Sequence, residues 1–306
     1  MENLEQLIQK KYSNIAGIVV MKDGKIAYEK YFCGCDAESR LHVFSVTKSI
    51  MSILIGIAID KGYISGVDAK ISDYLATKSN LTIKNFLTMT VPYKYWLAPY
   101  IQYFKSSDWV EFSLDLLGQE AGKFRYAPLI GPDILSGILE KATAKSVLDF
   151  ANENLFRPLG ILPKDPLIFE SKEEQMAFNN STNLNAWVAD ETGTNAAAWG
   201  LTLSAMDMAK IGQLFLNGGT WMGERIVSER WVKESTQEHS RWKRHNLPYG
   251  YLWWIGENGF AAMGDGGNLI FVNRKKNLVV SIVSKFKARS KDRIQFVEDY
   301  IEPMFL

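Results

Sequence analysis

A serine and a lysine three residues apart, Ser45 and Lys48, have the types and spacing that covalent catalysis needs. Residues i and i+3 of an α-helix lie on one face, one turn apart, so the lysine amine can reach the serine hydroxyl. An almost wholly apolar run follows at residues 50–59, which is typical of a buried helix. Burial lowers the pKa of a lysine, and a neutral Lys48 can accept the Ser45 proton and activate that oxygen as a nucleophile. The competing interpretation is a serine that only caps the helix N-terminus.

Tyr126 is a second candidate, and it stands in the sequence GKFRYAP of residues 122–128. A tyrosine in such a place is as often a packing aromatic as a functional group. As a functional group, a phenol beside a lysine is expected to have a lowered pKa. It would then take the proton from Ser45 and pass it to a leaving group, as a general base and then a general acid.

The third candidate is the sequence GDGGN of residues 264–268, which lies between two expected strands. A plain tight turn is the competing interpretation. Glycine also lets a substrate approach the backbone closely, so Asp265, Gly266 and Gly267 are candidates for substrate binding. A backbone N–H from this edge, with that of Ser45, could form an oxyanion hole. Losing one such donor typically costs about a hundred- to a thousand-fold in rate.

The strands and helices expected from the sequence must position these residues. Their order predicts a sheet assembled from both ends of the chain. Strands are expected at residues 15–21, 25–32, 249–255, 259–263, 268–273 and 278–284, with Asp23-Gly24 as the turn between the first two. Helices are expected at residues 2–12, 83–89, 107–117, 133–143, 146–156, 204–217, 228–235 and 290–302, and loops at 172–195. The Ser45 helix is expected to end near Gly62. We therefore expect an α/β domain from residues 1–71 and 200–306, and a mainly helical domain at residues 72–199.

Composition favours a small-molecule substrate. The 306 residues carry a net charge of +1, which gives no reason to expect nucleic acid or an anionic membrane as partner. No apolar run approaches the about 20 residues that span a bilayer, and the chain opens with acidic and polar residues, so we expect a soluble, cytoplasmic protein. Cys33 and Cys35 are too close for an unstrained disulfide, and the three histidines show no H-x-x-x-H spacing. We expect reduced thiols and no metal or cofactor.

Taken together, these motifs resemble those of the serine β-lactamase and penicillin-binding protein superfamily. The first family motif is matched by Ser45-Val46-Thr47-Lys48, the second, Tyr-x-Asn or Tyr-x-Ser, at Tyr126 only. The third, Lys-Thr-Gly in β-lactamases, falls on Gly264-Asp265-Gly266. Connecting segments at residues 82–90, 155–161 and 200–209 also match, in the family's order. The chain is most similar to the class C β-lactamase-related branch, which includes esterases, D-amino-acid peptidases and 6-aminohexanoate-dimer hydrolases.

The resemblance implies both a fold and a mechanism. The fold is α+β: an antiparallel sheet flanked by helices with an inserted all-helical domain, and the active site in the cleft between them. By resemblance Ser45 is the acyl-forming nucleophile, and Lys48 and Tyr126 form its proton-transfer pair. The backbone N–H groups of Ser45 and Gly267 would form the oxyanion hole.

Two departures from the family pattern bear on the substrate. Pro128 replaces the Asn or Ser that usually contacts a substrate amide, and proline has no polar side chain and no donor N–H. Gly264 stands where β-lactamases have a lysine that attracts a carboxylate, and Asp265 would repel one. We therefore predict a serine hydrolase that cleaves an ester or amide through an acyl-enzyme. A D-amino-acid peptidase or weak β-lactamase, and a non-catalytic binding protein on the same fold, are the alternatives.

Aromatic side chains are dense at residues 93–109. They are Tyr93, Tyr95, Trp96, Tyr100, Tyr103, Phe104 and Trp109. Core packing of the helical domain and an apolar pocket for an acyl or alcohol group are equally compatible with this pattern.

Overall fold

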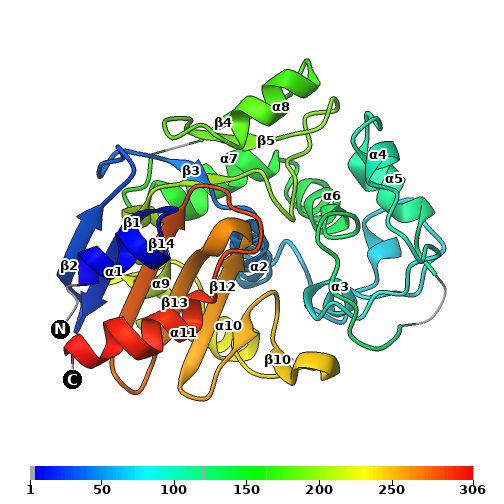
Figure 1. The fold of residues 1–306 in the computed structure, drawn as a ribbon. Helices are drawn as coiled ribbons and strands as arrows, with labels where there is room; N and C mark the ends of the chain where they lie inside the picture. Colours follow the sequence, from blue (N-terminus) through cyan, green and yellow to red (C-terminus); the bar gives the residue numbers. More distant parts are fainter. Residues whose placement is uncertain (1–3, 119–120, 163, 306) are drawn as a thin grey trace.

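The computed structural model describes residues 4–118, 121–162 and 164–305. At its centre is an eight-stranded antiparallel sheet with the strand order β2-β1-β14-β13-β12-β11-β10-β9 (Figure 1). Its strands are β1 (Ile15–Lys22), β2 (Lys25–Tyr31), β9 (Ser240–Trp242), β10 (Leu247–Tyr249), β11 (Trp254–Ile255), β12 (Gly259–Gly264), β13 (Asn268–Asn273) and β14 (Leu278–Ser284). Strand β1 from the start of the chain pairs with β14 from its end, with Ile18 opposite Ile282. The predicted sheet from both chain ends is confirmed.

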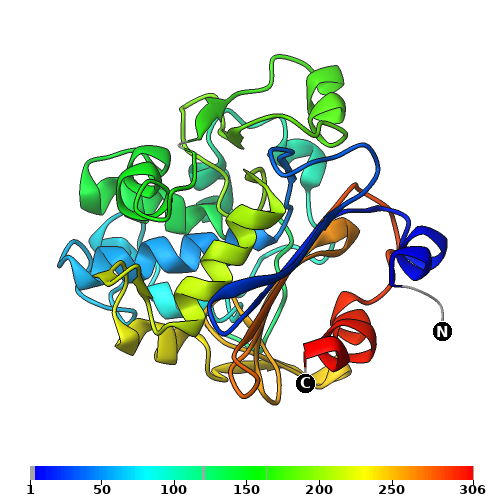
Figure 2. The ribbon, with the colours of Figure 1, turned by 90° about the vertical axis from the view of Figure 1, so that its left-hand side faces the viewer.

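The two faces of the sheet carry separate cores, because side chains alternate along each strand. On β1, Val19 and Met21 pack into the larger core, while Ile18 and Val20 pack into the smaller one. The smaller core is completed by α1 (Leu4–Lys11), α11 (Arg293–Phe296), η5 (Val297–Ile301) and η6 (Glu302–Phe305). Figure 2 shows these terminal helices on one side of the sheet and most other helices on the opposite side. The helix expected at residues 2–12 is α1, and Glu2 lies outside the described residues.

Helix α2 (Val46–Asp60) runs through the larger core directly after Ser45. All its residues from 46 to 58 are buried, as the apolar run predicts. Gly56 allows the Trp231 indole to lie against the helix, because a Cβ at Gly56 would come within 2.3 Å of that ring. Gly62 follows the helix with a φ of 77°, the left-handed conformation that glycine adopts at a helix end. Lys48 therefore stands in the interior of the protein.

The middle of the chain is mainly helical. Its elements are α3 (Ile83–Leu87), α4 (Tyr100–Tyr103), α5 (Trp109–Asp115), α6 (Asp133–Thr143), α7 (Val147–Ala151), η2 (Asn152–Phe156), β4 (Asp165–Leu167), α8 (Lys172–Phe178) and β5 (Ala186–Val188). Two of these, α8 and β5, lie where we expected only loops. Ser171 caps α8 by accepting a hydrogen bond from the Glu174 N–H, a serine-to-glutamate spacing that marks helix starts. The larger core holds side chains of the sheet, α2 and these helices alike, and the domain boundaries near residues 71 and 199 stay a prediction.

The expected strand at residues 249–255 is wrong, because the chain turns in its middle. Strand β10 ends at Tyr249 and β11 begins at Trp254. Leu252 between them has a left-handed φ of 61°. Gly250 lies so close to α10 (Glu229–Ser235) that a Cβ there would be 2.2 Å from the Ser235 carbonyl oxygen. An apolar run in a buried turn resembles a buried strand in sequence.

The remaining elements are short, apart from two helices on the larger core. Those two are α9 (Ala205–Leu216) and α10 (Glu229–Ser235). The others are β3 (Leu41–His42) paired with β6 (Thr202–Leu203), β7 (Thr220–Trp221) paired with β8 (Glu224–Arg225), and the turns η1 (Ile71–Asp73), η3 (Lys243–His245) and η4 (Asp265–Gly267). Within the described residues, none of the helices has the length and apolar character needed to cross a membrane.

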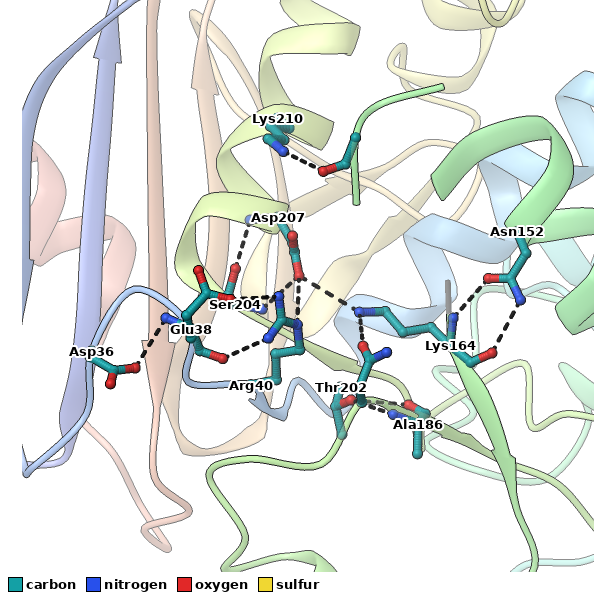
Figure 3. A network of polar contacts seen from close by, with 12 residues as sticks. Asp36, Glu38, Arg40, Asn152, Lys164, Ala186, Thr202, Ser204, Asp207 and Lys210 are labelled. Atoms are coloured by element: carbon teal, nitrogen blue, oxygen red, sulfur yellow. Dashed lines mark hydrogen bonds and ion pairs between the residues drawn. The ribbon is translucent and has the colours of Figure 1, made fainter. Parts of the chain in front are cut away.

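A buried polar network joins the start of α9 to the middle of the chain (Figure 3). Asp207 accepts a hydrogen bond from the Ser204 N–H at 3.1 Å and lies 3.7 Å from both Arg40 Nε and Lys164 Nζ. The Lys164 side chain is fully buried, and Nζ donates to Asn185 Oδ1 at 2.8 Å. Burial lowers the pKa of Lys164 to about 8. Arg40 also pairs with Glu38 at 3.4 Å, so Asp207 links the buried Lys164 and the partly exposed Arg40 to the start of α9.

Candidate active site

Ser45 is placed at the start of α2 but does not cap it. No hydrogen bond from the α2 backbone reaches its side chain. Lys48 Nζ instead lies 3.0 Å from Ser45 Oγ, and the Tyr126 hydroxyl is hydrogen-bonded to the same serine. Phe44, directly before it, has a φ of 50°, a strained conformation for a side-chain-bearing residue that is often found at functional sites. The structure therefore favours a reactive serine over a helix cap.

Lys48 is held so that a neutral amine can accept the Ser45 proton. Its Nζ is within 2.7 Å of the Pro128 carbonyl oxygen and 3.0 Å of the Ala198 carbonyl oxygen, besides Ser45 Oγ. A neutral amine has two N–H groups for these carbonyls, which directs its lone pair to the serine. Burial lowers the pKa of Lys48 to about 7, although the carboxylates of Asp265 and Asp133 act in the opposite direction. The predicted loss of proton affinity on burial is thus reproduced.

Pro128 contacts Lys48 through its backbone carbonyl, a role that the sequence did not suggest. Its side chain offers no polar group, yet its carbonyl makes the shortest of the three contacts to Lys48 Nζ, at 2.7 Å. Holding the Lys48 amine requires a backbone hydrogen-bond acceptor rather than a donor, so the absence of an N–H at Pro128 does not affect this contact.

Tyr126 lies where we expected it, but with a pKa moved in the unexpected direction. Burial raises the pKa of Tyr126 to about 12, with only partial compensation from its hydrogen bond to Ser45. The Lys48 amine lies over the ring, 5.2 Å from its centroid. The ring packs on Trp254, with centroids 5.6 Å apart. The expected lowering is wrong because burial outweighs the hydrogen bond to Ser45, and the Asp265 carboxylate raises the pKa further, so Tyr126 is a neutral phenol at neutral pH.

A hollow of about 270 Å³ opens beside Ser45, and we call it the Ser45 hollow. It is lined by His42, Phe44, Ser45, Tyr100, Phe104, Pro128, Leu129, Gln175, Asn179, Trp199 and Asp265. Apolar and aromatic side chains dominate, with two amides and one carboxylate among them. Such a lining is typical of a small-molecule site. Among the described residues, no three His, Cys, Asp or Glu side chains gather in a way that could hold a metal ion.

The glycine-rich turn after β12 reaches this hollow through Asp265. At Gly264 a Cβ would lie 2.2 Å from the Val43 carbonyl oxygen, so the end of β12 runs directly beside the segment that leads to Ser45. Gly267 lines a separate hollow, where a Cβ would meet the Arg293 guanidinium at 2.7 Å. Gly266 lies against Phe286. The structure thus brings Ser45, Lys48, Tyr126 and Asp265 together and places Gly266 and Gly267 outside the Ser45 hollow.

His42, which we did not single out, supports both sides of the site. It is buried, its Nδ1 lies 2.9 Å from Asn179 Oδ1, and its Nε2 accepts the Gly200 N–H at 3.0 Å. Its ring stacks on Phe44 with centroids 3.9 Å apart. Burial lowers the pKa of His42 to about 3, so the imidazole is neutral and can accept from Gly200. The sequence gave no signal for this supporting role of His42, because it is a single histidine without a metal-binding spacing.

Asp133 on α6 is a second residue that the sequence did not indicate. Its Oδ1 accepts the Ala197 N–H at 2.9 Å, and its Oδ2 accepts the Tyr103 hydroxyl at 2.9 Å. Burial raises the pKa of Asp133 to about 7. Because Ala197 precedes Ala198, whose carbonyl contacts Lys48, Asp133 positions one of the lysine's acceptors.

Comparison with known proteins shows the family to which this chain belongs. The sequence model of the Beta-lactamase family matches residues 4–296, and the chain belongs to that family. The chain is 23% identical over 262 residues to the 6-aminohexanoate-dimer hydrolase of Paenarthrobacter ureafaciens, a match that covers 78% of this chain and 61% of that protein's length. Together the family and this relative indicate a hydrolase, as the sequence predicts.

Two solved structures share the fold. A penicillin binding protein from Bacillus halodurans superposes with a TM-score of 0.75 at 16% identity, over 97% of this chain and 99% of that one. A family VIII carboxylesterase superposes with a TM-score of 0.68 at 16% identity, over 94% of this chain and 92% of that one. The predicted α+β fold with its antiparallel sheet is confirmed.

Proposed function

We propose that this protein is a serine hydrolase that cleaves an ester or amide bond through an acyl-enzyme on Ser45. The observation that carries the proposal is the set of contacts around Lys48. Two carbonyl oxygens and Ser45 Oγ lie within 3.0 Å of its buried Nζ. A lysine placed only for stability would be expected to face a carboxylate rather than a hydroxyl.

The first half of the reaction forms the acyl-enzyme. Neutral Lys48 takes the Ser45 proton while Ser45 Oγ attacks the substrate carbonyl carbon. The backbone N–H groups of Ser45 and Gly267 would stabilise the oxyanion, as expected from the sequence. As the carbonyl re-forms, the bond to the leaving group breaks. Lys48, through the Tyr126 hydroxyl, returns the proton to the departing oxygen or nitrogen.

The second half releases the acid. Water attacks the acyl carbonyl, Lys48 accepts a proton from that water, and the bond to Ser45 Oγ breaks as the serine recovers its proton. Every step uses groups that the chain itself supplies.

The charge beside the site bears on the substrate. Asp265 lines the Ser45 hollow, and a carboxylate there repels an anionic substrate group next to the scissile bond. This supports a neutral ester or amide over a β-lactam carboxylate, and the names of the relatives include both an amide-type and an ester-type hydrolase. A small-molecule substrate and a cytoplasmic location remain part of the proposal.

The test is the Ser45→Ala variant against a panel of p-nitrophenyl esters and anilides. We expect turnover by the wild type and none above background by the variant. Undiminished turnover in the variant would exclude Ser45 as the nucleophile. Hydrolysis of nitrocefin in the same panel would distinguish a weak β-lactamase from an esterase. A folded wild type that hydrolyses none of these substrates would support the alternative of a non-catalytic binding protein.

A further inference from the structure

A second hollow, of about 470 Å³, adjoins the Ser45 hollow, and we call it the distal hollow. The two share Phe104, just after α4, and Gln175 on α8, so the hollows are neighbours with a common wall. Helices α4 and α8 both lie along the upper edge of the molecule in Figure 1. The volume is in the range of about 300–1,000 Å³ that is typical of small-molecule pockets.

The distal hollow has an apolar lining that is unusually open to solvent. Ile101, Phe104 and Ile168, which all line it, are 70%, 40% and 43% exposed. Trp109 and Phe169 line it as well. Large apolar side chains gathered on a concave, exposed surface are typical of a binding site.

Aromatic contacts of Trp199 link the linings of the two hollows. Trp199 lines the Ser45 hollow and packs on His42, with centroids 5.8 Å apart. Its ring also contacts Phe104 at 5.6 Å and Phe169 at 6.3 Å, both of which line the distal hollow. A chain that leaves a carbonyl at Ser45 can therefore follow aromatic surface from one hollow to the other.

The charged residues that line the distal hollow do not favour a ligand group of either charge. Both signs occur among the charged lining residues, which are Lys105, Glu170, Lys172, Asp190 and Glu191. The buried Asp190 already accepts the Trp109 N–H at 2.9 Å and the Thr194 N–H at 3.0 Å. An apolar ligand segment is the better match for this lining.

The position of the proton-transfer pair, Lys48 and Tyr126, indicates which part of the substrate is directed toward the distal hollow. Tyr126 packs on Trp242 and Trp254, which belong to β9 and β11 at one end of the sheet. The leaving group must receive its proton from this pair and so lies toward Tyr126. The acyl part then points away from Tyr126, and Phe104 is an apolar side chain that lines both hollows.

We propose that the distal hollow binds the apolar chain of the acyl group, so that the protein prefers esters or amides of medium-length apolar acids. This inference rests on the proposed acyl-enzyme at Ser45. The sequence allowed two interpretations of the aromatic segment at residues 93–109, core packing or a pocket lining. The segment contributes to both, because Tyr103 is buried while Phe104 lines both hollows.

The kinetic test uses p-nitrophenyl acetate, butyrate, hexanoate and octanoate. We expect kcat/KM to rise about fourfold for each methylene that enters the hollow, which is the factor that corresponds to about 0.8 kcal/mol per buried CH₂. Ile168→Asp should flatten the rise and leave the acetate rate within about twofold of the wild type. Met176→Asp is the matched control: Met176 is on α8, 61% exposed, and lines neither hollow, so its profile should equal that of the wild type.

A binding test is independent of turnover. Ser45→Ala should bind octanamide more tightly than butanamide in calorimetry, and Ile168→Asp in that background should remove the difference. A flat chain-length profile with Ser45-dependent turnover, or a rise with the alcohol chain of alkyl acetates instead of the acyl chain, would overturn the inference alone. Chain-length-dependent binding without any Ser45-dependent turnover would overturn the proposed reaction and leave the apolar site in place.

Discussion

The pH dependence of Ser45 acylation measures the protonation of Lys48. Burial lowers the pKa of Lys48 from 10.5 to about 7. At pH 7 about half of the molecules would then carry a neutral amine, against about one in three thousand for a lysine of ordinary pKa. Because the neutral amine is the base, the acylation rate should rise about tenfold per pH unit below 7 and level off above it.

The assay is inactivation by a fluorophosphonate, followed by intact mass at pH values from 5 to 10. This reagent reports on the nucleophile without a pH-dependent chromophore. Lys48→Arg should show no such profile, since a guanidinium stays protonated throughout this range. A rate that still climbs between pH 8 and 10, or a Lys48→Arg variant with the wild-type profile, would refute the role of a neutral Lys48.

The same pKa predicts a cost in stability. Between pH of about 7 and 10.5 the unfolded chain holds a proton that the folded protein lacks, so the free energy of unfolding rises with pH in this window. The cost is complete below pH 7 and amounts to at most about 5 kcal/mol, at about 1.4 kcal/mol per pKa unit. Lys48→Met has no such titration, so its stability relative to the wild type should be greatest at pH 7 and below and should decline toward pH 10. Urea unfolding at several pH values measures this difference, and a difference independent of pH would contradict the buried, deprotonated lysine.

Three further variants, one of them with a matched control, test the surroundings of the site. His42, with its pKa lowered from 6.5 to about 3, stabilises the fold fully above pH 6.5 and progressively less as the pH falls toward 3, so the melting temperature of His42→Asn should depend less on pH in this window than that of the wild type. Gly264→Ala should lower kcat/KM by about a hundred- to a thousand-fold, because a Cβ 2.2 Å from the Val43 carbonyl would displace the end of β12 and an oxyanion donor with it. Gly256→Ala, whose nearest neighbour would be 3.8 Å away, is its control and should retain full activity. Asp207→Ala should destabilise the fold by about 3–5 kcal/mol in urea unfolding, since it leaves the buried Lys164 without its carboxylate, while kcat/KM of the folded protein stays within about twofold.

Local patterns predicted the elements that carry local signals. Asp23 and Gly24 have φ of 52° and 75°, the positive values that a two-residue hairpin turn requires and that this residue pair favours. The apolar run after Lys48 predicted both the burial of α2 and the lowered pKa of the lysine. These features depend on neighbours within one helix or one turn, which a sequence shows directly.

The parts that sequence could not give depend on contacts between distant segments. The carbonyls of Pro128 and Ala198 that hold Lys48 are backbone groups, and no residue type marks them. The pKa of Tyr126 depends on how deeply the fold buries it, and burial outweighs the lowering effect of its hydrogen bond to Ser45. The turn at residues 264–268 lies near the site, but only three-dimensional packing shows that Asp265 lines the Ser45 hollow and that Gly267 packs against Arg293.

The measurement that tests the central claim most directly is the site of covalent modification. The wild type is treated with a fluorophosphonate or a slowly released ester, digested, and its peptides are sequenced by mass spectrometry. A single adduct on Ser45, absent from Ser45→Ala and strongly reduced in Lys48→Met, is the predicted result. An adduct on another residue, or none on Ser45 in folded protein at pH 8, would contradict the assignment of Ser45 as the nucleophile.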